Sequence, residues 1–481
     1  MKNPAPPLVC QHQSLRNFPL HRPANLLVWL ILLGALAVDV SATRNLHAAE
    51  FRAGVARIKI TPPMPFWLSG YAARTNAAAS VRTDLWAKAL AIDDGKGGRV
   101  VFVTTDLIGL PREVSGVVAE RTRKRYKLQR SQLLLNSSHT HSGPVVWPNL
   151  SVLFDFDAEE QKRAIQYTGK LADDLTALVG EAIMNLSPAK ASSGHGSADF
   201  AINRRQSVSK GVGLGVNPSG PVDHDVPVLK ITSPEGLLRA VLFGYACHNT
   251  TLQVYPQVDS DYAGAAQRNL EAAHPGATAL FMMLCGGDQN PNPRGSEELA
   301  EKHGQSLAAA VDKVLAGEMK SVRGRVHTAF QTTKLDFAPH TLEQFEKEAN
   351  ETNVFKKRRA KLLLEAYDKN QPPRQIGYPV QAVRFADGPT FLALGGEVVV
   401  DYSLRTKREF AGEDIVVAGY CNEVMCYIPA LRVLREGGYE AVDSMIYYGR
   451  PGPFAENVEE TIFGTVRKVM RQAGAKTSVV K

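Results

Sequence analysis

Apolar, strand-like segments that end in polar loops recur along this chain of 481 residues. In the clearest case the leucines of residues 133–135 run into Asn136-Ser137-Ser138-His139-Thr140-His141 and a Gly-Pro turn. A short apolar run that ends in turn residues is typical of a buried strand. If the extended geometry persists through Thr140, His139 and His141 project to the same side, because side chains alternate along a strand.

Two imidazoles at the end of a strand have more than one interpretation. They can bind a metal ion together, or divide into one metal ligand and one acid/base group. The alternative is a pair of loop histidines that only form hydrogen bonds. The pair alone does not decide between these interpretations, so the decision depends on the rest of the chain.

Other strand-like segments end in the same kind of loop, and these loops contain His248, Asp288 and Glu397. Ligand sites in α/β folds gather at such strand ends. Together with His139 and His141, these loops supply three imidazoles and two carboxylates. That set is sufficient for a zinc site with three or four ligands and a spare acid/base group.

The order of strand and helix patterns predicts the fold class. Strand patterns occupy residues 51–60, 85–92, 99–106, 226–231, 238–248, 279–285, 380–385, 390–394 and 415–420, and helix patterns occupy 159–185, 297–315, 343–368 and 455–470. No Pro/Ser-rich linker and no internal repeat separates them. We therefore expect one large α/β domain of mixed α+β character, with mixed sheets and a zinc site at strand-end loops.

The composition narrows the range of partners. With 44% hydrophobic and 22% charged residues the chain has an ordinary globular composition. The net charge is +8, but no long Lys/Arg run and no aromatic-interleaved basic segment is present. Nucleic-acid binding is therefore not expected. Contact with an anionic membrane surface stays open, and the sequence does not give the oligomeric state.

The first 49 residues have the layout of a secretory signal peptide. Basic residues precede a short apolar run, residues 26–38, and small residues such as Ala48 and Ala49 follow it. The run is too short to span a bilayer comfortably. We expect a signal peptide at 1–49, a mature chain from Glu50, and export to the periplasm or medium. An uncleaved membrane anchor is the alternative, and the cleavage site stays open.

Cysteine usage is consistent with export without requiring disulfides. Cys10 would leave with the signal peptide, and the four that remain are Cys247, Cys285, Cys421 and Cys426. An oxidising compartment permits disulfides, but buried free thiols that pack beneath the site are equally consistent with the sequence. No Cys-x-x-Cys motif is present, which excludes a structural zinc ribbon.

These features together resemble the neutral/alkaline, non-lysosomal ceramidase family. The motifs that carry the resemblance are Ala53-Gly54-Val55, Ile60-Thr61-Pro62-Pro63, Gly70-Tyr71, residues 139–144 and Tyr439-Glu440. The resemblance implies a mixed α/β catalytic domain, here residues 50–475, with zinc between strand-end loops. The immunoglobulin-like domain that usually follows in the family is expected to be absent, since the chain ends soon after its last helix.

The resemblance also implies roles for individual residues. The implied zinc ligands are His139, His248, Glu397 and Tyr427. Tyr427-Ile428 matches the family's ligand motif because it lies twelve residues before Tyr439-Glu440, as 427 + 12 = 439. The implied catalytic and substrate-contacting residues are His141, as acid/base and substrate-orienting group, Arg204, in Asn203-Arg204, and Tyr439.

Structural interpretations of the same residues stay open. His248 could be an ordinary buried histidine, Glu397 a helix N-cap, and Tyr427 a core aromatic residue. His224 is expected to be structural or to support another side chain. Asp288 could orient a ligand histidine or simply close its turn.

One position departs from the family pattern. Ceramidases carry Gly-Asp-x-Ser-Pro-Asn, whereas residues 287–292 here place Asn290 at the Ser position. An amide cannot act as a hydroxyl nucleophile. A mechanism with zinc-activated water survives this change and a Ser-nucleophile mechanism does not. The change also puts ceramide itself in doubt as the substrate.

The leading hypothesis is an exported, zinc-dependent hydrolase that cleaves an amide bond of a small or lipid N-acyl, ceramide-like substrate by zinc-activated water. A second hypothesis, motivated by Asn290, is a zinc hydrolase of a different amide or an ester. A third is a non-catalytic, metal-stabilised binding protein at the cell surface. It predicts bound zinc without an open coordination position and no turnover of any acyl substrate.

Overall fold

The computed structural model of the protein describes residues 51–476. Contacts divide the chain into Met1–Ala48 and Ala49–Lys481, and the described residues all belong to the second unit. The expected signal peptide, residues 1–49, and Cys10 lie outside the described residues. Export, membrane anchoring and the domain boundary at residue 50 therefore stay predictions.

Most strands belong to one mixed sheet of twelve. Nine follow in the order β16 (Ile415–Ala418), β14 (Thr390–Leu394), β13 (Gln375–Asp387), β12 (Lys320–Asp336), β5 (Ser187–Ser197), β1 (Phe51–Lys59), β2 (Trp86–Asp93), β3 (Arg99–Thr105) and β4 (Leu133–Ser137). From β5 the sheet branches to β8 (Asp225–Thr232), β9 (Leu238–Tyr245) and β10 (Thr278–Met283). The prediction of a mixed α/β fold is confirmed.

Two small sheets lie apart from the large one. One has the order β11 (Gln289–Pro291), β6 (Ala201–Val208) and β7 (Gly211–Asn217), and the other pairs β15 (Glu397–Val398) with β17 (Tyr427–Ile428). Both are short, and both contain candidate site residues.

The large sheet curls around a shared apolar core. Buried side chains from all twelve of its strands pack into one cluster, which includes Phe102, Leu242 and Phe391. The two ends of the nine-strand path approach each other, since Asn136 of β4 forms an isolated bridge with Cys421, just after β16. Curling therefore brings strands that are distant in sequence to a common edge.

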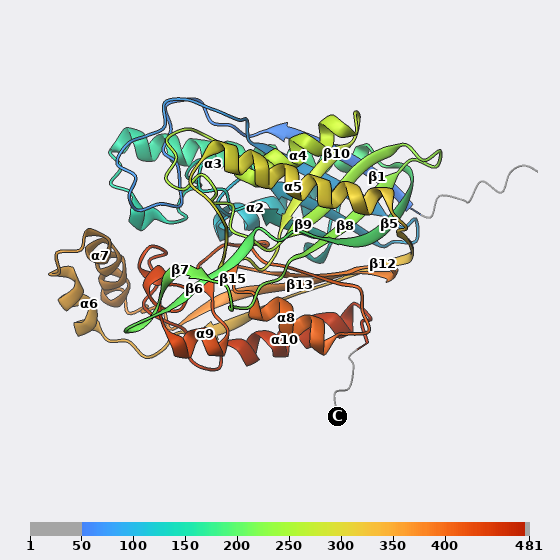
Figure 1. Ribbon diagram of the computed structural model, residues 1–481. Helices are drawn as coiled ribbons and strands as arrows, with labels where there is room; N and C mark the ends of the chain where they lie inside the picture. The colour runs from blue at the N-terminus through green and yellow to red at the C-terminus, as the bar shows by residue number, and fades with distance from the viewer. Residues whose placement is uncertain (1–50, 477–481) are drawn as a thin grey trace, which may run out of the picture. The chain divides into compact units, whose positions relative to one another are not determined.

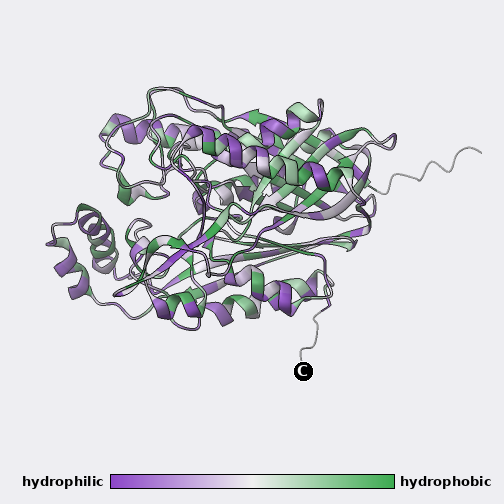
Figure 2. Ribbon diagram, viewed as in Figure 1, coloured by the Kyte–Doolittle hydropathy of each residue, from purple (hydrophilic) through white to green (hydrophobic). Residues whose placement is uncertain are grey.

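Helices cover the outer faces of the sheet (Figure 1). α2 (Arg112–Tyr126) and α3 (Ala158–Met184) pack on β1–β4, whereas α4 (Asp261–Ala273) and α5 (Glu297–Ala316) pack on β8–β10. α8 (Asp401–Glu409), α9 (Leu431–Glu436) and α10 (Val458–Gln472) lie on the face of β12–β14. Figure 2 shows the strands largely green and these helices banded in purple and green, as amphipathic cover requires.

The remaining elements are short or peripheral. The charged segment 343–368, expected as one helix or a helix pair, is the pair α6 (Leu342–Ala349) and α7 (Val354–Asp368), which protrudes at one side (Figure 1). The 3-10 turns are η1 (Arg130–Gln132), η2 (Ser151–Leu153) and η3 (Asp443–Ile446). No helix within residues 51–476 is long and apolar enough to cross a membrane.

Sequence patterns missed several strands that the structure contains. They are β5, the β6–β7 hairpin and β12, which at 17 residues is the longest strand. β5 is rich in Ser and Gly, β7 is rich in Gly, and β12 carries exposed Lys and Arg between its apolar residues, so none of the three shows a continuous apolar run. Pairing with β1 and β13, rather than intrinsic propensity, places β5 and β12 in the large sheet, whereas β6 and β7 pair with each other in the small sheet that β11 completes.

The four cysteines of the described residues are free and buried. The open question between disulfides and packed thiols is thus answered in favour of thiols. Burial raises the pKa of Cys421 and Cys426 to about 12, so both thiols stay protonated at neutral pH.

Candidate metal centre

The carboxyl ends of three strands are fastened together by one buried side chain, Asn136. Its amide nitrogen donates to the carbonyls of Met283 (3.0 Å) and Gly419 (2.9 Å), and its amide oxygen accepts from the Met283 backbone at 2.8 Å. The three strands are β4, β10 and β16. Since each bond is buried, the amide fixes the relative positions of the loops that follow these strands.

The first of these loops departs from the geometry expected from sequence. β4 ends at Ser137, and His139 adopts a left-handed conformation with φ of 61°. The extended geometry therefore does not persist through Thr140, because the His139 amide turns to donate to the Leu107 carbonyl at 2.9 Å. The two imidazoles nevertheless meet, with 3.1 Å between the Nε2 atoms of His139 and His141. A non-glycine residue held at positive φ is typical of functional sites.

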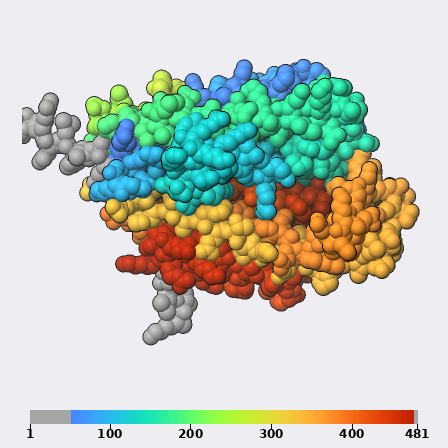
Figure 3. Space-filling view, turned by 180° about the vertical axis from the view of Figure 1, so that it is seen from behind, coloured from blue at the N-terminus to red at the C-terminus, as the bar shows by residue number. Residues whose placement is uncertain are grey.

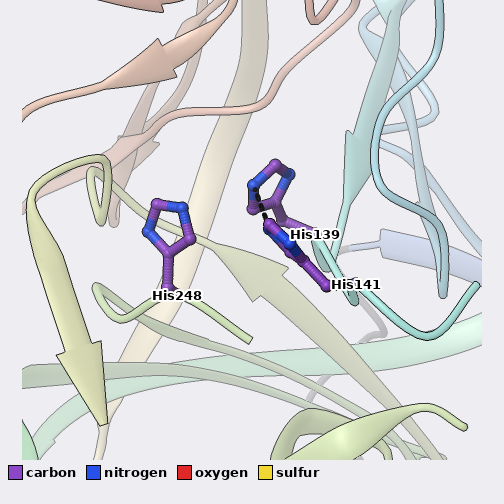
Figure 4. Close-up of side chains that lie close together, drawn as sticks. All are labelled: His139, His141 and His248. Atoms are coloured by element: carbon purple, nitrogen blue, oxygen red, sulfur yellow. Dashed lines mark hydrogen bonds between the residues drawn. The ribbon is translucent and has the colours of Figure 1, made fainter. Parts of the chain in front are cut away.

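His139 and His248 present the same nitrogen to a common centre (Figure 4). His139 Nδ1 lies 2.6 Å from the Ile108 carbonyl, and His248 Nδ1 lies 2.7 Å from the Gly286 carbonyl. A carbonyl can only accept, so Nδ1 must be the protonated nitrogen in both rings. Each Nε2 then carries a lone pair that faces the centre, as in histidines that bind a metal.

Glu397 and Tyr427 complete the cluster from the two-stranded sheet. They are register partners in the parallel pair β15–β17, so the fold places them side by side. Glu397 Oε2 lies 2.9 Å from His139 Nε2 and 3.1 Å from His248 Nε2, and the Tyr427 hydroxyl lies 3.1 Å from His248 Nε2. The four predicted ligands thus converge, although they come from four separate segments of the chain.

These donors fit a zinc ion. Two neutral imidazoles, one carboxylate and one phenol oxygen are nitrogen and oxygen ligands of the kind that zinc takes in catalytic sites. Burial opposes ionisation of Glu397, but the imidazoles of His139 and His248 hold its pKa well below the usual range. The ring nitrogens of His139, His141 and His248 lie within 4.8 Å of one another, so His141 is also within reach of an ion.

His141 is confined by the loop at Gly70–Arg74. Its ring lies 4.7 Å from the ring of Tyr71, and its backbone carbonyl accepts from Arg74 Nη2 at 2.7 Å. Its Nδ1 is buried without a partner among residues 51–476. Burial, together with His139 and His248, lowers the pKa of His141 well below its usual value, so the ring is neutral.

Arg204 uses its whole guanidinium within the site. Nε donates to Glu440 at 2.8 Å, Nη2 to the Tyr427 hydroxyl at 3.0 Å and Nη1 to the Asn290 side-chain oxygen at 3.3 Å. Tyr439 lies edge-on to Tyr427, with ring centroids 5.5 Å apart. No described residue bonds the Tyr439 hydroxyl, so this hydroxyl can donate to a ligand.

A cavity of about 260 Å³ joins these groups. Its lining contains every site residue expected from the sequence, namely His139, His141, Arg204, His248, Glu397, Tyr427 and Tyr439. Leu150, Leu153 and Leu214 give it an apolar part. A second cavity of about 390 Å³ shares Leu150 and Tyr448 with the first, and Figure 3 shows the molecule hollowed where red C-terminal residues lie between teal and orange segments.

Sequence reasoning missed two residues that support the ligands. The Tyr448 hydroxyl donates to Glu397 Oε1 at 2.6 Å, and Glu440 pairs with both Arg204 and Arg205. Glu440 stood in the Tyr439-Glu440 motif without a role, and no local pattern distinguished Tyr448. Asp288 accepts from Asn203 and from the Val400 amide, and His224 bonds the Ala201 carbonyl, so both are outside the cluster.

Fold and site together define an α/β protein whose strand-end loops bring together a His/Glu/Tyr cluster with the donors of a candidate metal centre. The family described as neutral/alkaline non-lysosomal ceramidase, N-terminal, matches residues 51–353. The chain belongs to this family. The matched region contains His139, His141, Arg204, His248 and Asn290.

Individual relatives give the same result with lower coverage. Neutral ceramidase of Pseudomonas aeruginosa is 25% identical over 277 residues, 54% of this chain and 40% of the relative. Neutral ceramidase of Drosophila melanogaster is 33% identical over 112 residues, 22% of this chain and 15% of the relative. The chain thus spans less than half the length of these curated relatives.

Solved structures share the fold. The crystal structure of neutral ceramidase from Pseudomonas aeruginosa has a TM-score of 0.67 at 19% identity and covers 90% of this chain and 76% of its own. A structure titled ceramidase complexed with C2 has a TM-score of 0.68 at 17% identity, and the match covers 90% and 77% of the two chains. Because these matches cover 90% of this chain, the shared fold extends beyond residue 353, where the family match ends.

Proposed function

We propose that this chain is an exported, zinc-dependent hydrolase that cleaves the amide bond of an N-acyl, ceramide-like substrate. The observation that carries the proposal is the convergence of His139, His248, Glu397 and Tyr427 at one end of a cavity, with both imidazoles fixed in the tautomer that a metal requires. Family membership supports the same reaction class. The N-terminal pattern of residues 1–49 supports export.

The protein would hold zinc through His139 Nε2, His248 Nε2, a Glu397 oxygen and the Tyr427 hydroxyl. When bound there, zinc acidifies water and polarises an amide carbonyl. Tyr448 and the carbonyls of Ile108 and Gly286 keep these ligands oriented before the ion arrives.

His141 is placed to transfer a proton from the attacking water to the leaving amine. Its Nε2 lies 3.1 Å from His139 Nε2, on the same side as the ligands, and the neutral ring can accept a proton there. The same nitrogen can return the proton to the leaving amine. Tyr71 packs against the His141 ring in a tilted arrangement and Arg74 donates to the His141 backbone carbonyl, so the imidazole stays where the transfer occurs.

Tyr439 and Arg204 have different roles in the proposed reaction. The Tyr439 hydroxyl is free to donate to the oxygen on which negative charge develops. Arg204 is already committed to Glu440, Asn290 and Tyr427, so it orients Tyr427 and contributes its charge to the cavity wall.

The test combines metal analysis with an amidase assay on the purified chain. We expect about one zinc per chain, loss of N-acyl amide hydrolysis on chelation, and recovery when zinc is added back. A metal-free protein, or a zinc protein that turns over no acyl substrate, would refute the proposal. The latter result would favour the metal-stabilised binding protein.

Asn290 favours a second candidate, a zinc hydrolase of a different amide or an ester. Its side chain lines the cavity where the family has a serine, and its oxygen is held by Arg204. A panel of N-acylsphingosines, short N-acyl amines and the matching esters distinguishes the two candidates by their relative kcat/KM.

A further inference from the structure

One wall of the catalytic cavity carries an arginine that has no acidic partner. Arg294 lines the cavity, and no carboxylate within residues 51–476 pairs with it. The other arginine of the lining, Arg204, is neutralised by Glu440 at 2.8 Å. Glu397 is the only acidic residue of the lining, and the proposed zinc would offset its charge. The unpaired guanidinium therefore gives this wall a net positive charge.

Asn290, on β11 and four residues before Arg294, adds hydrogen-bond donors to the same wall. Its side-chain oxygen faces Arg204 Nη1 at 3.3 Å. Arginine has no acceptor, so the amide must keep its oxygen toward Arg204 and its NH₂ group turned away. No described residue accepts from that NH₂ group. The family's serine could not have presented two donors here while it accepted from Arg204.

Thr250 adds a hydroxyl that is buried and unpartnered. Its side chain lines the cavity, the residue is 3% exposed, and no described group bonds its Oγ1. A buried polar atom without a partner is unfavourable, and an acceptor on a ligand in the cavity would satisfy this hydroxyl.

The three groups come from two loops that are bonded to each other. The Gly295 amide donates to the Thr251 carbonyl at 2.7 Å, and the His248 amide donates to the Gln289 carbonyl at 2.9 Å. These bonds fasten the segment with Thr250 to the segment with Asn290 and Arg294. The donors thus have a fixed relation to the ligand His248, which lies two residues before Thr250.

We propose that Arg294, Asn290 and Thr250 bind an anionic group, a carboxylate or a phosphate, on the non-acyl part of the substrate. This inference rests on the proposed amidase function and narrows its substrate class to charged N-acyl compounds. A guanidinium, an amide NH₂ and a hydroxyl all donate to an acceptor that brings no hydrogen of its own. The neutral diol of a sphingoid base would offer no opposite charge to the guanidinium of Arg294, which is exposed to the solvent at the cavity.

The test uses three probes that share a dodecanoyl chain and an amide. They are N-dodecanoylglycine, N-dodecanoylethanolamine and N-dodecanoylphosphoethanolamine, so a carboxylate, a hydroxyl and a phosphate are compared. We measure kcat/KM for each with the zinc-loaded protein, and Kd for each by calorimetry. Wild type is expected to favour at least one anionic probe over the neutral one by about tenfold in either quantity.

Variants separate this site from direct binding to the metal. Arg294→Gln and Thr250→Val should bring the anionic-to-neutral ratio close to one, while zinc content stays at the wild-type value. Arg471→Gln removes an exposed arginine of α10 outside the cavity lining and should leave the ratio unchanged. An anion held by zinc alone would give the same ratio in wild type and in Arg294→Gln, which would overturn the inference.

The two proposals fail in different ways. Turnover of the neutral probe with no anionic preference would sustain the amidase and refute the anion site. An anionic preference in Kd that Arg294→Gln abolishes, without turnover of any probe, would sustain the site and refute the amidase. Absence of both binding and turnover for all three probes would refute the inference as well.

Discussion

Among the clusters of residues 51–476 that combine histidine with carboxylates, two are built in opposite ways. At the candidate metal centre, His139 and His248 are each 1% exposed and share Glu397 through their Nε2 atoms. At the junction of β5, β8 and the segment before β16, His195 has a side chain 37% exposed. Its Nδ1 lies 2.8 Å from Asp225 and its Nε2 lies 2.7 Å from Asp414.

The partner of Nδ1 determines whether the histidine of each cluster can bind a metal. At the candidate metal centre Nδ1 donates to a backbone carbonyl, which fixes the tautomer and leaves a lone pair on Nε2. At His195 both nitrogens face carboxylates, so both are protonated and neither can bind a metal. The hydrogen bonds that His195 donates to Asp225 and then to Asp414 raise its pKa to about 9. Proximity to a carboxylate therefore does not identify a metal site; a backbone carbonyl behind the ring is compatible with one, because it leaves the other ring nitrogen free.

The comparison predicts the largest effect for removal of a ligand histidine. His139→Ala should lower zinc affinity and hydrolysis by roughly a thousandfold or more, since one of the ligands is lost and Glu397 keeps a buried charge. His195→Ala is the matched control, and it should bind zinc and turn over substrate as wild type does. Zinc content and kcat/KM are measured for both variants. Equal zinc content in the two would contradict the assignment of His139, but not His195, as a metal ligand.

A second prediction concerns the wall behind His141. Gly70 has φ of +95°, and a Cβ there would lie 2.5 Å from His141 Nδ1. Gly70→Ala should therefore displace the ring and lower kcat about 100-fold while zinc is retained. Gly276→Ala is the control for backbone strain, because Gly276 has φ of +90° with nothing within 4 Å of the added Cβ. A similar loss of kcat in both variants would show that strain, not contact with His141, is the cause.

Removal of the Tyr448 hydroxyl, which donates to Glu397, should have a smaller effect, on zinc affinity. Tyr448→Phe removes the donor to Glu397 Oε1, and such supporting contacts change metal affinity by about tenfold. Tyr167→Phe removes a comparable hydrogen bond, 2.8 Å to the Ile60 carbonyl, outside the cavity. Titration of each apo protein with zinc measures the effect, and we expect weaker binding only for Tyr448→Phe. Unchanged affinity would mean that the imidazoles alone hold the carboxylate.

Much of the fold was predictable because its local patterns agree with its tertiary structure. β1, β2, β3, β8, β9 and β10 are apolar or alternating and lie within a few residues of their predicted positions, as do α3 and α5. β5, β7 and β12 were not predictable, because their Ser, Gly and charged residues are held by neighbouring strands, β5 and β12 in the large sheet and β7 in a small one. Val117 of α2 and Ile165 of α3 are apolar residues of amphipathic helices yet are 40% and 49% exposed, so an apolar residue in such a helix is not always buried.

The site residues that directly follow strands could be predicted from sequence, whereas the contacts that depend on the tertiary structure could not. His139, His141 and His248 follow strands directly, so the strand-end rule found them. The pairing of Glu397 with Tyr427 in the parallel β15–β17 register could not be read from sequence, since two-residue strands have no pattern. Tyr448 and the left-handed turn at His139 have no local signal either.

The smallest predicted effect is a pH dependence of stability at His195. Because its pKa is raised in the folded protein, its contribution is fully present below the unfolded value of about 6.5 and is lost as pH rises through about 9. The contribution is about 1 kcal/mol, since water screens a side chain that is 37% exposed. Chemical denaturation of wild type and His195→Gln should therefore give a stability difference that shrinks between about pH 6.5 and about pH 10. A difference that is constant across this range would mean that His195 acts through neutral hydrogen bonds, and the contrast between the two clusters would then rest on tautomer alone.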